Sequence, residues 1–245
     1  MASYLELNND ITQVIDDSFF NLAFIRKERH YFIKTSGPGI YGWMGYDIDV
    51  SGIDNPVVAF SSVCGCCYYN MTATTIRVMA TGANQQNIPN ARDKLNNEAN
   101  YVDIYIFGRP LDNTPNIGFK AWDANGKLVF DANHRYMQPQ QMYQETGNYT
   151  PITQGGKYVN SKTISLPPGR KYAAYPLNRI YYVSAEWLSN GWESWYQGDV
   201  YSSVTAIEAG TVWLTSGKID QVEDISGVSI GVCRHHYMFL DVTNY

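Results

Sequence analysis

The sequence predicts an all-β protein, and three observations lead to this fold class. Short apolar runs, of which 102–107 is the clearest alternating one, are separated by turn residues along the whole chain. The stretch 117–137 has the pattern of two strands joined by a tight polar turn. No stretch longer than about ten residues carries the 3.6-residue apolar period of an amphipathic helix. We therefore expect antiparallel strands packed as β-sandwich-like domains.

The hairpin predicted at 117–137 has a counterpart at the start of the chain. In the later copy, the turn residues 123–126 tolerate the positive φ angle that a tight chain reversal needs. The first copy places a strand at 4–7, a turn at 8–10 and a second strand at 14–16, in the same order. At a constant offset of 115 residues (131 − 16 = 115) the matching residues are Phe119 with Tyr4, Trp122 with Leu7, Val129 with Val14 and Asp131 with Asp16.

This repeat predicts two tandem domains, 1–115 and 116–245, the second being a diverged duplicate with longer loops. Two further matches lie at larger offsets, as expected if loops lengthened inside the second copy. They pair 178–184 with 55–61, at an offset of 123 (178 − 55 = 123), and 228–232 with 102–106, at an offset of 126 (228 − 102 = 126).

Three local expectations complete the fold prediction. The strand that starts at 22 is expected to end at the charged run 26–29, and a new strand is expected at 31–33. The polar, Asn-rich stretch 83–100 is typical of a long exposed loop. The short apolar segment 237–242 is expected to be an edge strand whose backbone groups a neighbouring subunit covers.

Composition narrows the function classes. Hydrophobic residues at 44% and charged residues at 17% are typical of a folded chain, and 20 tyrosines favour strands and interfaces. A net charge of −5 argues against a nucleic-acid partner. No apolar run is long enough for a membrane span, so no membrane insertion is expected. The N-terminal stretch lacks the basic and apolar regions of a secretory signal, so we expect synthesis in a cytoplasm.

The four cysteines, Cys64, Cys66, Cys67 and Cys233, allow two interpretations. A metal site would combine the CxCC stretch with Cys233 and the histidines after it, but this spacing departs from the CxxC pairs of zinc sites. Alternatively the thiols are reduced and mostly buried in strands, where adjacent Cys66 and Cys67 point to opposite faces. We predict the second arrangement, with no bound metal and no cofactor.

Recognisable catalytic motifs are missing from the sequence. It contains no GxSxG, no HExxH and no phosphate-binding glycine loop. Asp16 with Asp17, and Asp47 with Asp49, are either the paired carboxylates of a glycoside hydrolase or solvated caps at strand ends, and caps are the commoner use. We therefore expect no catalytic residues and no enzymatic activity, and a polysaccharide-degrading enzyme stays the last of the alternatives.

An aromatic-rich stretch at 187–196 is the candidate binding site. On one interpretation its rings, with a nearby amide and carboxylate, form a platform that stacks on sugars or an anchor in a protein interface. On the other interpretation the Asn-Gly pair is a hairpin turn and the rings pack across two strands. The candidate binding residues are Trp187, Asn190, Trp192, Glu193, Trp195 and Tyr196.

The later hairpin also carries a resemblance to a known family. The run 118–131, GFKAWDANGKLVFD, followed by Arg135, resembles the hairpin motif G-x-x-V-x-N/D-x-x-G-x-x-x-x-D of small β-rich tail proteins of tailed bacteriophages. In those proteins the hairpin often follows a strand like 103–108, DIYIFG, as it does here. The resemblance covers about 1–137. The first copy of the hairpin departs from it at Ile11, which stands where the turn glycine would be.

This resemblance implies a structural protein of the virion, at the tail tip, the collar or a fibre, made in the host cytoplasm. The implied partners are other virion tail proteins, further copies of the chain in a homo-oligomer, and a host surface receptor or glycan. The family brings no catalytic residues to carry over. The resemblance therefore favours protein–protein assembly as the function, with a receptor- or carbohydrate-binding module of the tail as the alternative.

Overall fold

Strand β8 (Tyr101–Gly108) shows how an apolar run becomes the middle of a sheet. Its even-numbered apolar residues, such as Ile104, face the core between two sheets. Its odd-numbered aromatic residues, such as Tyr105, belong to a second apolar cluster on the opposite face. Because both faces are covered, almost the whole strand is buried, which is the burial that a continuous apolar run predicts.

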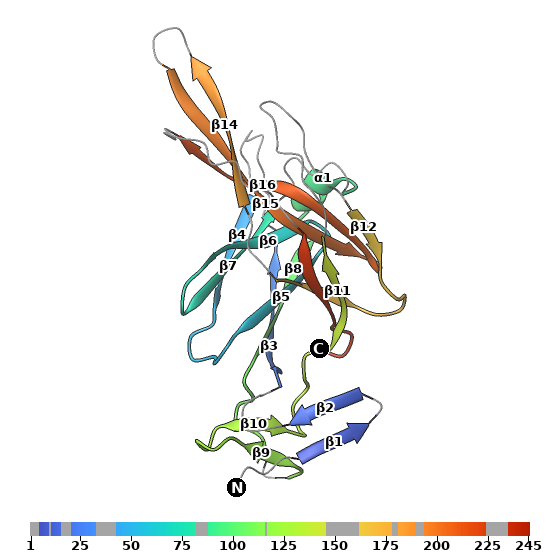
Figure 1. Cartoon of the computed structure of the whole chain (residues 1–245). Coiled ribbons are helices and arrows are strands. Elements are labelled where there is room, and N and C mark those ends of the chain that lie inside the picture. Colours follow the sequence, from blue (N-terminus) through green and yellow to red (C-terminus); the bar gives the residue numbers. More distant parts are fainter. Residues whose placement is uncertain are drawn as a thin grey trace.

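The computed structural model of the chain consists almost entirely of antiparallel strands, which confirms the predicted all-β class (Figure 1). The structure describes residues 5–9, 11–15, 21–32, 43–81, 88–115, 117–145, 162–177, 181–189, 194–223 and 235–245. Within these ranges the strands form two large sheets and two small hairpins. The arrangement is that of a β-sandwich with additions at both ends.

The first large sheet contains β8 and five further strands of the described ranges. These are β3 (Ala23–Tyr31), β5 (Val57–Ser62), β11 (Pro139–Gln144), β13 (Tyr172–Pro176) and β17 (His236–Asp241). They lie in the order β11-β17-β13-β5-β8-β3, and every neighbouring pair is antiparallel. Strands β11 and β3 are therefore the edges of this sheet.

The second large sheet has seven strands in the described part of the chain. These are β4 (Trp43–Asp49), β6 (Gly65–Met71), β7 (Thr75–Thr81), β12 (Lys162–Ser165), β14 (Tyr181–Ser189), β15 (Ser194–Glu208) and β16 (Thr211–Glu223). Six of them lie in the order β12-β16-β15-β6-β7-β4. Strand β14 pairs with β15 outside this path, so the sheet branches there.

The two large sheets pack face to face around one core. Phe60, Ile104 and Phe239 come from the first sheet, Val78 and Leu214 come from the second, and all five are buried in the same cluster. Burying a side chain of this size stabilises the fold by about 1.5–3 kcal/mol. From β3 to β8 the chain passes repeatedly between the two sheets, as it does in jelly-roll sandwiches.

Each large sheet takes strands from both halves of the chain in the same order. In the first sheet β5, β8 and β3 follow one another outward from the junction, as β13, β17 and β11 do on the other side. In the second sheet β6, β7 and β4 are matched by β15, β16 and β12. The predicted regions 1–115 and 116–245 therefore share both sheets, which meet at the antiparallel pairs β5·β13 and β6·β15. The division into two domains stays a prediction.

The two predicted hairpins both form in the structure. Their strands are β1 (Leu5–Asn9) with β2 (Ile11–Ile15), and β9 (Lys120–Trp122) with β10 (Leu128–Asp131). Leu7 pairs with Gln13 in the first hairpin, and Trp122 pairs with Leu128 in the second. The same cross-strand pair thus recurs after 115 residues (122 − 7 = 115 and 128 − 13 = 115). Figure 1 draws both hairpins at the end of the molecule opposite the tip of β14.

The match of 178–184 to 55–61 was wrong. By its place in the sheets the counterpart of β5 is β13, whereas β14 pairs with β15 in the other sheet. Strand β14 is therefore an addition to the second half. A continuous apolar run indicates a strand but not its neighbours, which is why the two runs matched in sequence. The other matched segment, 228–232, lies outside the described residues.

The expectation that 237–242 is an uncovered edge was also wrong. Strand β17 lies inside the first sheet, where β11 pairs with one side of it and β13 with the other. Tyr237, Phe239 and Leu240 are buried. Strands of the same chain already satisfy the backbone groups that a neighbouring subunit was expected to cover.

Strand β3 corrects a third expectation, because it continues through the charged run 26–29 instead of ending there. The strand pairs with β8 from Ala23 to Tyr31, with a register shift near Ile25. It is an edge strand, and charged residues are common at sheet edges because they discourage pairing with other chains. The charges therefore mark an edge strand and not a strand end.

The stretch 83–100, expected to be an exposed loop, contains a short helix, α1 (Ala91–Leu95). Ile88 and Leu95 are buried, so this segment contributes to the packing of the sandwich. A helix of five residues is too short to show an apolar period in the sequence. Among the described residues no helix is long and apolar enough to span a bilayer.

We predict that Phe239→Ala lowers the free energy of unfolding by about 3–5 kcal/mol, because it opens a cavity between the sheets. Chemical denaturation followed by circular dichroism measures the change. Met142→Ala is the matched control, since Met142 lies on the neighbouring strand β11 and is 62% exposed. We expect it to change stability by less than about 0.5 kcal/mol. Equal losses in the two variants would contradict the place of β17 in the core.

Candidate functional site

The aromatic-rich stretch forms a hairpin on a long arm of the second sheet. Strand β14 pairs with β15 along its whole length, from Tyr181 opposite Ser202 to Ser189 opposite Ser194. Strand β16 pairs with β15 only as far as Gln197. Beyond Gln197 the described arm is therefore two-stranded, and Figure 1 shows it projecting away from the sandwich.

The register at the tip of the arm assigns the candidate binding residues to two faces. Trp187 pairs with Tyr196, and Leu188 pairs with Trp195. Because successive residues of a strand belong to opposite faces, Trp187 and Tyr196 share one face and Trp195 belongs to the other. Two antiparallel strands of a hairpin are thus present, and the Asn-Gly pair predicted as its turn lies between Ser189 and Ser194, outside the described residues. The remaining candidates, Asn190, Trp192 and Glu193, lie outside the described residues.

The arm has two properties of a surface that binds other chains. A two-stranded ribbon without a covering layer is marginally stable by itself. Within the described residues β14 pairs with β15 alone, so its other edge presents unpaired N–H and C=O groups. The strand is nine residues long, contains no proline and carries one charged residue, Glu186. An edge of this kind accepts a further strand from a partner.

The acidic pair on β4 is arranged as surface contacts. Asp47 accepts two hydrogen bonds from Arg77 on β7, each at 2.6 Å. Asp49 accepts a hydrogen bond from the backbone N–H of Ser51 at 2.8 Å. Both carboxylates are exposed. Asp49, at the end of β4, is arranged as the cap offered above as the alternative to a catalytic pair, whereas Asp47 lies inside the strand and forms an ion pair with Arg77. The other acidic pair, Asp16 and Asp17, lies outside the described residues.

The cysteines of β6 lie on opposite faces of the strand, as predicted. Cys66 is in the core between the sheets, and Cys67 is in a small cluster with Met79 on the other face. Cys64, just before β6, is also buried, and burial raises the pKa of its thiol to about 12. None of the three forms a disulfide. In the described ranges, which exclude Cys233, no three His, Cys, Asp or Glu side chains are grouped to hold a metal ion.

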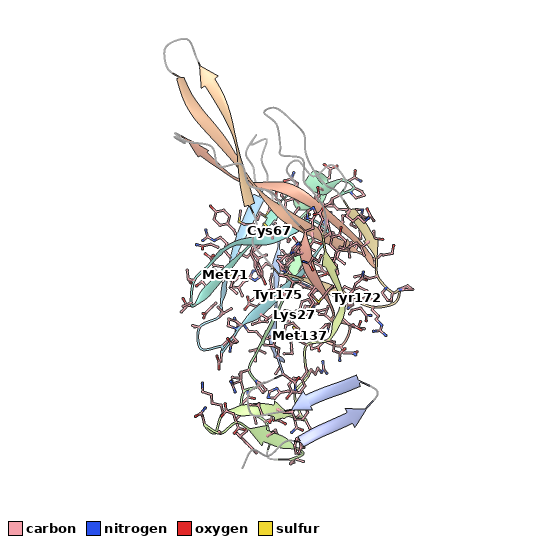
Figure 2. The ribbon with its side chains drawn as sticks, in the orientation of Figure 1. Lys27, Cys67, Met71, Met137, Tyr172 and Tyr175 are labelled. Atoms are coloured by element: carbon pink, nitrogen blue, oxygen red, sulfur yellow. The ribbon has the colours of Figure 1, made fainter. Side chains whose placement is uncertain are left out.

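A cleft that the sequence analysis did not identify lies at the rim of the sandwich, and we call it the junction cleft. Its volume is about 360 Å³. The first half of the chain contributes β3, β8 and the end of β5, and the second half contributes the start of β13 and the β15–β16 turn. Figure 2 labels Lys27 of β3 and Tyr172 of β13, both in the body of the sandwich between the arm and the small hairpins.

The β15–β16 turn that borders the junction cleft is tight. Ala209 and Gly210 have positive φ angles of 49° and 80°, the geometry of a two-residue type I′ turn. An alanine rarely adopts this conformation, and such strain persists only where the surrounding structure fixes it. Glu208, next to the turn, lines the cleft together with Ala209 and Gly210.

Asp103 of β8 is the charged centre of one wall of the junction cleft. Arg29 donates two hydrogen bonds to its carboxylate, at 2.6 and 2.8 Å, and the Nζ of Lys27 lies 2.7 Å from it. Burial alone raises the pKa of Asp103, but the hydrogen bonds from Arg29 and Lys27 outweigh burial and keep the pKa below its usual value. The hydrogen bonds to Asp103 in turn raise the pKa of Arg29. All three groups are therefore charged at neutral pH.

Aromatic rings extend this wall and orient its guanidinium. The guanidinium carbon of Arg29 lies 3.7 Å from the centroid of the Tyr101 ring, a cation–π contact. Tyr31, which is 54% exposed, packs edge-on against Tyr101 with the ring centroids 5.6 Å apart. Arg29 is thus held by a carboxylate on one side and by an aromatic face on the other.

The opposite wall of the junction cleft comes from the second half of the chain. Arg170 donates a hydrogen bond to the carboxylate of Asp241 at 2.7 Å. Glu208 pairs with Lys94 at 2.5 Å. Lys171 is exposed, and its backbone N–H donates to a side chain near the C-terminal end. The junction cleft therefore offers charges of both signs to one polar ligand.

The turn of the β9–β10 hairpin follows the predicted chemistry. The carboxylate of Asp123 accepts hydrogen bonds from the backbone N–H groups of Asn125 and Lys127, both at 2.9 Å. Gly126 has a φ angle of 76°, which the absence of a side chain permits. Arg109 connects this turn to the first half, since it pairs with both Asp123 and Asp54.

The same hairpin has a buried polar centre at Asp131. Its carboxylate accepts hydrogen bonds from the hydroxyl of Thr114 and from the backbone N–H and the side-chain amide of Asn133. The Nζ of Lys120 lies 3.6 Å away. Burial alone raises the pKa of Asp131, but these hydrogen bonds and the charge of Lys120 outweigh burial and lower the pKa to about 2. The charged carboxylate therefore stabilises the hairpin.

Comparisons with protein-family models, with curated proteins and with solved structures find no match to this chain. The arm and the junction cleft are therefore the parts of the described structure that bear on function.

Two features of the sequence, not used above, could have indicated one wall of the junction cleft. Asp103 is an acidic residue inside a run that is otherwise apolar, and a charge in a buried strand needs a partner of opposite charge. The charged run 26–29 supplies that partner from the adjacent edge strand. The second wall had no such signal, because Arg170, Lys171 and Glu208 stand in turns and at strand ends, where charges are common.

We predict that the β9–β10 hairpin loses protection from hydrogen exchange in acid. The folded-state pKa of Asp131, about 2, is below the roughly 3.9 of an unfolded aspartate. Its contribution to stability is therefore complete above about pH 4 and is lost as the pH falls through the folded-state pKa. Mass spectrometry of exchanged peptides from 117–137 should show a loss of protection on the order of tenfold between those pH values.

Asp131→Asn is the control for the other acidic groups. In this variant, which lacks the titrating carboxylate, the β9–β10 hairpin should be less protected from hydrogen exchange at neutral pH. Its protection should also change less in acid than that of the unaltered protein. A loss of the same size in both proteins would mean that another group is responsible.

Proposed function

We propose that this chain is a structural protein of a phage virion, placed at the tail tip, the collar or a fibre. It acts by binding other tail proteins and further copies of itself, and not by catalysis. The location follows from the resemblance of 118–131 to tail proteins. The mode of action, binding to other protein chains, is inferred from the open strand edge and the aromatic positions of the arm.

The observation that carries this proposal is the unsupported tip of the β14–β15 arm. Three aromatic positions, Trp187, Trp195 and Tyr196, stand on the part of the ribbon that has only two strands. Each such ring buries about 150–250 Å² when fully engaged, so three rings approach the roughly 800 Å² per partner of a standard interface. A partner that covers both faces of the tip would supply the layer that the described chain does not.

Backbone pairing adds to this interface. The outer edge of β14 accepts a strand from a neighbour, which exchanges exposed N–H and C=O groups for main-chain hydrogen bonds. Aromatic contacts and strand addition would then both stabilise the same interface. Both become possible because the arm projects from the sandwich.

The location is tested by quantitative mass spectrometry of purified particles of the phage that encodes the chain. We expect a fixed number of copies in each virion. Absence of the chain from washed, infectious particles would contradict the proposed location.

We predict that removing the tip abolishes incorporation while the sandwich stays folded. Ala185 and Gly198 are register partners, so a two-residue Asn-Gly turn between them closes the ribbon below the aromatic positions. Virions made with this variant should contain at least about tenfold less of the chain, as expected for the loss of an aromatic hot spot. Circular dichroism should show unchanged strand content.

A pair of single substitutions locates the interface. Trp187→Ala should reduce incorporation, whereas Trp122→Ala, which removes an exposed ring from the β9–β10 hairpin, should leave it unchanged. The opposite result would move the interface to the β9–β10 hairpin and contradict the role of the arm.

A further inference from the structure

We propose that the junction cleft binds a sugar unit that carries one carboxylate, such as a uronic or sialic acid residue of an acidic polysaccharide. The evidence is the balance of charges around the cleft, the mixture of groups that line it, and its size. None of these depends on the proposed place in a virion.

The junction cleft has a surplus of positive charge in a protein whose net charge is −5. Arg29 and Lys27 both pair with the single carboxylate of Asp103, so this group of three side chains has a net charge of +1. Arg170 and Lys94 are each matched by one carboxylate, and Lys171 adds a second unmatched charge. The charged residues of the lining are Arg29, Arg170, Lys171, Asp103 and Glu208. The count adds their ion-pair partners outside the lining, which are Lys27, Lys94 and Asp241.

The carboxylates of the lining decide which kind of anion fits. Asp103 and Glu208 repel a multiply charged ligand such as phosphate, but both accept hydrogen bonds from neutral hydroxyl groups. Ser61 and Tyr101 add hydroxyls to the lining. A ligand with one carboxylate and several hydroxyls satisfies the surplus cations and the acceptors together. Acidic sugars have this combination of groups.

The size of the junction cleft and its open side suit one unit of a longer chain. Its volume of about 360 Å³ is at the small end of the roughly 300–1,000 Å³ of small-molecule sites. Because the cleft is open to solvent, the neighbouring sugars of a polysaccharide would continue along the surface beside Tyr31, which is exposed next to Tyr101. A ring with an exposed face is a common surface for sugar contacts.

The junction cleft and the arm tip are independent sites. Along β15, Tyr196 at the tip and Ile207 at the cleft are eleven residues apart, roughly 36 Å at the rise of an extended strand. Loss of one function therefore leaves the other measurable.

The test is a saturation-transfer NMR titration of the full chain with free sugars. The acidic probes are galacturonic acid and N-acetylneuraminic acid, the neutral probe is galactose, and inorganic phosphate is the competing anion. We expect at least one acidic sugar to bind about tenfold more tightly than galactose, as expected for one charge-assisted hydrogen bond, and to be released by added salt. We expect phosphate to displace it only at high concentration.

Two variants and a matched control assign the binding to the junction cleft. Lys171→Ala and Arg170→Gln should each weaken binding of the acidic sugar by about tenfold. Lys162→Ala removes an exposed lysine from β12, outside the lining, and should leave binding unchanged. Circular dichroism of each variant checks that the fold is retained.

Four results would overturn the inference. These are equal binding of galactose and the acidic sugars, binding of phosphate as tight as that of the acidic sugars, unchanged binding by Lys171→Ala and Arg170→Gln, and no binding of either acidic sugar.

Discussion

The two halves of the chain are held together by the apolar core that they share, and the other features depend on it. In the described residues each sheet crosses the junction through one register pair, between β5 and β13 and between β6 and β15. Backbone pairing is therefore a small part of the contact. Tyr68 packs edge-on against Phe60 of its own half and Tyr175 of the other, with ring centroids 5.8 and 6.4 Å apart. Without this core the junction cleft would lose one wall and the arm would lose its base.

The charges of the junction cleft also discourage the edge of the first sheet from pairing with other chains. Strand β3 is an edge, and an uncharged edge of nine residues would invite pairing with other chains. Lys27 and Arg29 prevent this, and they also neutralise Asp103, which would otherwise be a costly charge in a strand covered on both faces. The same side chains thus protect the edge, stabilise β8 and leave one positive charge over for a ligand. Because Lys27 and Arg29 have all three roles, the proposed ligand site lies at the edge of the sheet.

The sequence was sufficient for features that depend on neighbouring residues. The period of two identified β8, and the Asp-Ala-Asn-Gly turn identified the β9–β10 hairpin, because both patterns follow from backbone geometry within a few residues. The opposite faces of Cys66 and Cys67 followed from the same alternation. The all-β class followed from the sum of these local signals. The two apolar strands of the arm were also predictable, since the alternatives for 187–196 included a pair of strands joined by a turn.

Features that depend on distant residues were not predictable from these patterns. The choice of β13 as neighbour of β5 and the interior place of β17 depend on how the whole core packs, and many apolar runs fit such a place. The junction cleft needs five separate segments, so no single motif marks it. The run 178–184 resembles 55–61 because both are apolar, yet β5 is covered by a second sheet, whereas among the described residues β14 pairs with β15 alone. Whether an apolar strand becomes core or interface is thus decided by what lies across from it, which makes the arm the surface where a partner has the most to contribute.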